Sequence, residues 1–115
     1  MGTEKLIIQQ KWEAMAAYVY VLLRHIPKSE RFTLGAEIRQ SVWRGLRLVI
    51  AANAMRRGRS DLMDKIDVEI KVLQGMIRTG HDMGIVPAKK YENCSRLLVE
   101  LGRLLGGWKK SIGIK

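Results

Sequence analysis

The sequence predicts an all-α protein: a four-helix bundle whose helices run alternately up and down. Apolar residues recur at three- and four-residue steps in four segments of about 20 residues each, the periodicity of helices with one buried face. No segment shows sustained alternation of apolar and polar residues, so strands are not expected. The only two prolines, Pro27 and Pro87, lie where one periodic segment gives way to the next. Short links between helices of similar length are typical of an up-down-up-down bundle.

Length and composition fit a single domain, residues 1–115, that needs neither a disulfide nor a metal to fold. A chain of 115 residues buries about two thirds of its unfolded surface. Cys94 is the only cysteine, which excludes an internal disulfide and indicates a reducing compartment. The longest uncharged run, residues 14–23, is too short to cross a bilayer, and the first residues lack a signal-peptide pattern. We expect a soluble, cytoplasmic protein with no cofactor and no membrane partner.

The first two helices are expected over about residues 5–26 and 33–57. In the first, apolar residues spaced by seven form a seam over three heptads: Ile8, Met15 and Leu22, with Trp12, Val19 and Ile26. Pro27 ends this helix, and Thr33 can cap the next one. The expected buried side of the second helix consists of Leu34, Ile38, Val42, Val49 and Ile50. Gly58 suits a C-cap at the end of that helix.

The last two helices are expected over about residues 60–80 and 87–110. Ser60 can cap the third helix, and Pro87 fits the first position of the fourth. The buried stripe of the third is Leu62, Ile66, Ile70, Leu73 and Ile77. The seam of the fourth is Tyr91, Cys94, Leu98, Leu101, Leu105 and Trp108.

The net charge of +10 is the strongest global indication of function. It favours a polyanionic partner: nucleic acid, a membrane surface or an acidic protein. Residues 32–59 hold six basic and one acidic residue, and residues 86–115 hold seven basic and two acidic. Residues 60–83 hold three basic and five acidic, so the positive field comes mainly from the second and fourth helices.

Four cations of the fourth helix are spaced by seven: Lys89, Arg96, Arg103 and Lys110, here called the basic ridge. Heptad spacing drifts only about 20° per step, so the four line one ridge roughly 30 Å long. Such a ridge can follow phosphates. The alternative is a solvated face softened by neighbouring glutamates, and the sequence leaves the two even.

The second helix carries an arginine–tryptophan patch. Arg39, Trp43 and Arg47 are neighbours at four-residue steps, with Arg44 alongside. The patch can stack bases or contact phosphates. Alternatively Trp43 packs at a subunit contact and the arginines pair with acidic groups of the third helix, the alternative that interface composition favours.

Two further segments are candidate contacts. The corner of Arg56, Arg57 and Arg59 either complements the helix dipole or binds an anion. The run Gly106-Gly107-Trp108, followed by Lys109 and Lys110, places two glycines in a helical pattern, which indicates close backbone approach or a helix end. This run serves either the bundle core or a subunit contact, and we favour the contact.

Catalysis has little support. His25 and His81 lack ligand-like neighbours at helical spacing, and Cys94 lies on an apolar seam, where an inert core residue is expected. We interpret Asp61, Asp64 and Asp67 as exposed residues at the start of a helix, not as a carboxylate cluster for catalysis. We expect a protein that is not an enzyme.

Three runs resemble the accessory variability determinant (Avd) proteins of diversity-generating retroelements: LGAEIRQ (34–40), VIAAN (49–53) and KKYENCSRLLVELGRLLGGWKKS (89–111). More distantly, the chain is similar to four-helix-bundle proteins encoded in intervening sequences of ribosomal RNA genes. The resemblance covers about residues 12–111, and its most specific part is the ending from Glu100 to Trp108. Gln40 departs from it, since relatives often carry arginine there.

The resemblance implies a four-helix bundle that assembles into a barrel-shaped homopentamer with a basic surface. It implies a non-catalytic partner of the element's reverse transcriptase that binds RNA or DNA during error-prone cDNA synthesis. A purely protein-binding scaffold, whose arginines meet acidic patches on a polymerase, is the main alternative; a membrane-surface protein is a remote one.

Overall fold

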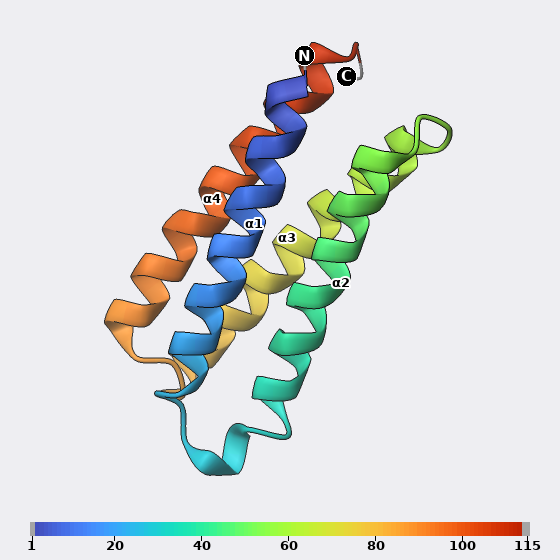
Figure 1. Ribbon diagram of the computed structural model, residues 1–115. Coiled ribbons are helices and arrows are strands. Elements are labelled where there is room, and N and C mark those ends of the chain that lie inside the picture. Colours follow the sequence, from blue (N-terminus) through green and yellow to red (C-terminus); the bar gives the residue numbers. More distant parts are fainter. Residues whose placement is uncertain (1, 114–115) are drawn as a thin grey trace.

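Four helices form the protein, which is described by a computed structural model over residues 2–113 (Figure 1). They are α1 (Gly2–Leu23), α2 (Leu34–Ala54), α3 (Arg59–Asp82) and α4 (Ala88–Ser111), and a short 3-10 helix, η1 (Lys28–Glu30), lies between α1 and α2. All regular secondary structure in these residues is helical. The prediction of an all-α four-helix bundle is therefore confirmed.

Each helix packs against the helices next to it in the chain, and α4 closes the bundle against α1. The result is a rod of 43 × 22 × 20 Å. The connection between α2 and α3 lies at the same end as the start of α1 and the end of α4, and the other two connections lie at the opposite end (Figure 1). Within residues 2–113, no helix has both the length and the apolar character that a bilayer crossing requires.

One hydrophobic core runs along the bundle, and the heptad seams supply most of it. All six predicted seam residues of the first helix are buried, although α1 ends at Leu23 and Ile26 lies in the connection that follows it. Cys94, Leu98, Leu101, Leu105 and Trp108 of α4 are buried too. The prediction for Ile50 is wrong, since its side chain is 45% exposed while Val49 is buried. Consecutive residues of a helix point about 100° apart, so only one of the two can face the core.

Helices α1 and α2 pack closely together at Gly45. A Cβ atom there would lie 2.0 Å from Cζ2 of Trp12, so only glycine admits the indole ring. The Trp12 indole N–H donates a hydrogen bond of 2.9 Å to the carbonyl oxygen of Val42, which fixes the ring across α2. Sequence analysis missed this contact because nothing in the spacing of α2 distinguishes Gly45 from a weak helix residue.

Helix starts differ from the predictions in detail. The Thr33 hydroxyl does not cap α2; it donates to a carboxylate oxygen of Glu30 at 2.7 Å. Ser60 does not cap α3, because Gly58 occupies the N-cap position with φ +75°, a conformation that glycine adopts at little cost. Gly58 therefore turns the chain into α3 and does not end α2, and Pro87 stands just before α4, not inside it.

Candidate functional site

The basic ridge is exposed along α4. All four of its cations are exposed, and within the described residues none forms an ion pair with a carboxylate. The Arg96 guanidinium donates to the side-chain oxygen of Asn93, a neutral partner that leaves its charge in place. Glu100 lies three residues before Arg103 in the sequence, and its carboxylate oxygen is 3.8 Å from the Lys11 ammonium of α1. The charges of the ridge are thus available to a ligand.

A shallow hollow of about 460 Å³ lies beside the ridge. Its lining is Ser95, Arg96, Leu97, Val99, Glu100 and Arg103. Val99 and Glu100 lie between the two arginines, three and four residues after Arg96. The geometry places two cations on the rim of an open surface.

Lys109 and Lys110, which were both predicted to contact a ligand, differ in exposure and pairing. The Lys109 ammonium lies 3.2 Å from a carboxylate oxygen of Asp64, and the Lys109 side chain is only 18% exposed. The pair joins α4 to α3. Lys109 is thus paired with a carboxylate of its own chain, whereas Lys110 is exposed and pairs with no carboxylate among the described residues.

The arginines of α2 are mostly engaged. The Arg44 guanidinium lies 3.3 Å from a carboxylate oxygen of Glu69 on α3, and Glu69 is buried and also accepts the Ser41 hydroxyl. The predicted alternative of pairing with the third helix is thus observed for Arg44. Arg39 donates to the carbonyl of Arg31 at 2.9 Å. Arg47, also exposed, has no such partner among the described residues.

Trp43 is exposed but held in place. Its side chain is 42% exposed, and its indole N–H donates to the Tyr20 hydroxyl at 2.9 Å. The two rings meet edge to face with centroids 5.9 Å apart. Trp43 therefore presents a fixed aromatic surface, and both predicted uses, stacking and subunit contact, stay open to it.

The arginine corner divides into one structural residue and two exposed ones. The Arg59 Nε–H donates to the carbonyl oxygens of Ala52 at 2.7 Å and Met55 at 3.0 Å, near the C-terminus of α2. Its guanidinium also lies 6.0 Å from the ring centre of Trp108, within cation–π range. Arg56 and Arg57 are exposed and show no ion pair with another described residue.

The three residues of the ending Gly106-Gly107-Trp108 do not share one environment: the glycines are exposed and the tryptophan is buried. Trp108 is 1% exposed and lies in the core of its own bundle, so its side chain gives no surface to a second copy. The expectation of a subunit contact is wrong for Trp108, because the apolar seam of α4 turns it inward. Gly106 and Gly107 are exposed, and a Cβ at either would meet nothing within 4 Å, so intrachain packing does not require them.

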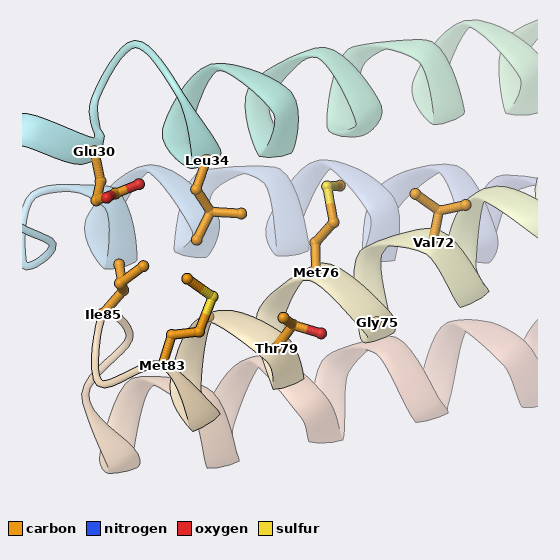
Figure 2. Close-up of a pocket in the computed structure, with 9 residues that line it drawn as sticks. Glu30, Leu34, Val72, Gly75, Met76, Thr79, Met83 and Ile85 are labelled. Atoms are coloured by element: carbon orange, nitrogen blue, oxygen red, sulfur yellow. The ribbon is translucent and has the colours of Figure 1, made fainter.

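An apolar groove of about 470 Å³ between α2 and α3 was not predicted. Figure 2 shows Leu34, Met76, Met83 and Ile85 directed toward the same space, with Glu30 at one end. Met83 is 68% exposed. Sequence analysis missed the groove because its residues come from two helix ends and two connections, which no single periodicity joins.

The side chains that could hold a metal are scattered over the described residues: no three of their His, Cys, Asp and Glu side chains come together as a metal site. Burial raises the pKa of the Cys94 thiol to about 12, so the thiol stays protonated at neutral pH, the form that is a weak nucleophile. His81 stacks on Tyr91 with ring centres 4.5 Å apart, and its Nδ1 lies 3.0 Å from the Val86 carbonyl oxygen.

Fold and surface together define a basic, all-α four-helix-bundle protein with an open cationic ridge along α4. The sequence profile of the bAvd-like family matches residues 6–112. The chain belongs to the bAvd-like family, which confirms the resemblance drawn from its sequence. No curated protein matches the chain.

Proposed function

We propose that this protein is a non-enzymatic accessory subunit of a diversity-generating retroelement. It binds the reverse transcriptase and holds the element's RNA or cDNA on its basic surface, supporting mutagenic cDNA synthesis. Membership of the bAvd-like family supports the class of protein. The basic ridge supports nucleic-acid contact, because four exposed cations lie along one face of α4 and pair with no carboxylate among the described residues.

We further propose that the subunit assembles as a ring-shaped homo-oligomer, a pentamer by family resemblance. Gly106 and Gly107 support a contact between copies, since two glycines lower helix stability and the protomer's own packing gives no reason for them. Light scattering measures the assembly directly, and a monomeric mass would contradict it.

Fluorescence anisotropy with labelled single-stranded RNA at several salt concentrations tests the nucleic-acid contact. For single strands, the slope of log affinity against log salt is about −0.7 per phosphate contact. The double variant Arg96→Gln/Arg103→Gln should weaken binding and reduce the size of that slope by about 1.4. The matched control is Lys65→Gln/Arg78→Gln, which removes the same charge from exposed positions on α3.

Equal losses in the two double variants would show that only net charge matters. Affinity that does not change with salt would contradict phosphate contact altogether. Circular dichroism should show both variants folded, since all four side chains are exposed.

A purely protein-binding scaffold is the second candidate, and the apolar groove in Figure 2 favours it. An open groove lined by Met76 and Met83 suits an apolar segment of a partner protein, because methionine adapts to irregular surfaces. Capture of the reverse transcriptase that survives nuclease treatment, together with no RNA affinity, would support the scaffold over the leading proposal.

A further inference from the structure

Trp43 separates two hollows of different chemistry on the surface of α1 and α2. On one side is an apolar slot of about 340 Å³, lined by Glu13, Ala16, Ala17, Tyr20, Trp43 and Leu46. On the other is a basic hollow of about 370 Å³, lined by Gln40, Trp43, Arg44 and Arg47. An aromatic ring thus stands between an apolar space and two cations.

The lining of the apolar slot suits a flat ring. Ala16 and Ala17 leave its floor low, and Trp43 and Tyr20 give it aromatic walls, 42% and 37% exposed. The hydrogen bond between the two side chains fixes the Trp43 ring before any ligand arrives. A pre-positioned ring loses little conformational freedom on stacking.

The basic hollow is also pre-organised. Glu69 is buried, and its carboxylate lies 3.3 Å from the Arg44 guanidinium, so it anchors one side of this arginine. Arg47 lies three residues after Arg44 on the same helix, so the two side chains are neighbours on its surface. Arg47 is exposed and has no carboxylate partner among the described residues. The Glu13 carboxylate at the slot repels anions there, so a phosphate is favoured on the side of Arg44 and Arg47.

We propose that this site binds one unpaired nucleotide of a single strand: the base enters the apolar slot and stacks on Trp43, and its phosphate lies against Arg44 and Arg47. A base inside a duplex is already stacked on both faces and cannot enter, so the site selects single strands. The inference rests on the proposed nucleic-acid function and adds a second contact, on α2, to the basic ridge on α4. Six basic residues against one acidic in residues 32–59 favour nucleic acid as occupant over a second copy of this basic chain.

Anisotropy with fluorescein-labelled oligothymidylate, and with the same strand paired to oligoadenylate, tests the proposal. Trp43→Ala should lower single-strand affinity roughly 5- to 150-fold, the effect of losing one base–aromatic stack, and should leave duplex affinity unchanged. Phe32→Ala is the matched control, because Phe32 is 88% exposed and lies outside both hollows. It should change neither affinity.

Tryptophan fluorescence gives an independent readout. Trp12 and Trp108 are 0% and 1% exposed, so iodide should quench Trp43 alone. Oligothymidylate should protect the wild-type protein from iodide, and Trp43→Ala should abolish the quenching itself. Iodide quenching that oligothymidylate does not reduce would overturn the proposal.

Two other outcomes would overturn it in distinguishable ways. If Trp43→Ala binds oligothymidylate normally while Arg96→Gln/Arg103→Gln does not, the ridge alone holds nucleic acid and the proposed function stands without this site. If Trp43→Ala lowers the mass measured by light scattering, Trp43 is a subunit contact. If the wild-type protein binds neither probe, the proposed function fails together with this inference.

Discussion

The helices α2 and α4 share the same features and use them in opposite ways. Each is basic and each contains a tryptophan and helical glycines. In α2 the tryptophan faces outward, with Trp43 42% exposed. The Trp12 ring occupies the space that a side chain at Gly45 would need. In α4 the tryptophan faces inward, with Trp108 1% exposed, and the glycines face open space.

The cations of the two helices also differ in whether they pair with a carboxylate of their own chain. Arg44 of α2 is tied to a buried carboxylate, whereas the ridge of α4 has no carboxylate partner among the described residues. Residue type and helical spacing are alike in the two helices, so neither sets the role of a residue. The neighbouring helix sets it: α1 supplies Trp12 to α2, and α3 supplies Glu69.

The largest expected effect separates the two tryptophans. Trp108→Ala should lower the free energy of unfolding by about 3–5 kcal/mol, the cost of a large cavity in a packed core. Trp43→Ala should lower it by about 1–2 kcal/mol, since much of the ring is already in water. Urea unfolding of both variants gives the comparison, and equal losses would show that Trp43 is part of the core.

Replacing a glycine by alanine should lower stability in α2 and raise it in α4. Gly45→Ala places a methyl group 2.0 Å from Trp12, and overpacking of this kind costs about 1–3 kcal/mol. Gly106→Ala meets nothing within 4 Å and should raise helix stability by up to about 1 kcal/mol. Thermal unfolding, followed by circular dichroism at one protein concentration, measures both changes.

Gly106→Ala has a second readout. If the glycine face is a contact between copies, the variant should be more stable as a protomer but assemble less, as light scattering would show. A variant that gains stability and keeps its mass would contradict the proposed contact.

The sequence predicts the fold well because the buried seams are local in the chain. Ile8, Met15 and Leu22 repeat by seven, and a repeat of this kind defines both a helix and its inner face. Boundaries are harder: Gly58 looked like the end of one helix and proved to start the next. Either use satisfies the local pattern, and only the path of the chain decides between them.

Surface roles could be predicted only in part. The four cations of the basic ridge lie on one helix, so spacing alone places them together. The partners of Arg44 and Lys109 come from α3, through Glu69 and Asp64, and pairing across helices depends on the rotation of each helix in the bundle. The Trp12–Gly45 contact also depends on the rotation of each helix in the bundle. The spacing of residues within one helix does not predict that rotation.

The smallest expected effect concerns two arginines of one corner. Arg59→Gln should lower the free energy of unfolding by about 1 kcal/mol, because it removes hydrogen bonds from a charged donor to the carbonyls near the end of α2. Arg57→Gln should change it by less than about 0.5 kcal/mol, as surface substitutions usually do. Urea unfolding in moderate salt measures both, and anisotropy with labelled RNA should rank them the other way, with Arg57→Gln binding more weakly. A stability loss in Arg57→Gln as large as in Arg59→Gln would contradict the division of this corner, because it would mean that both arginines hold the helix end and neither is reserved for a ligand.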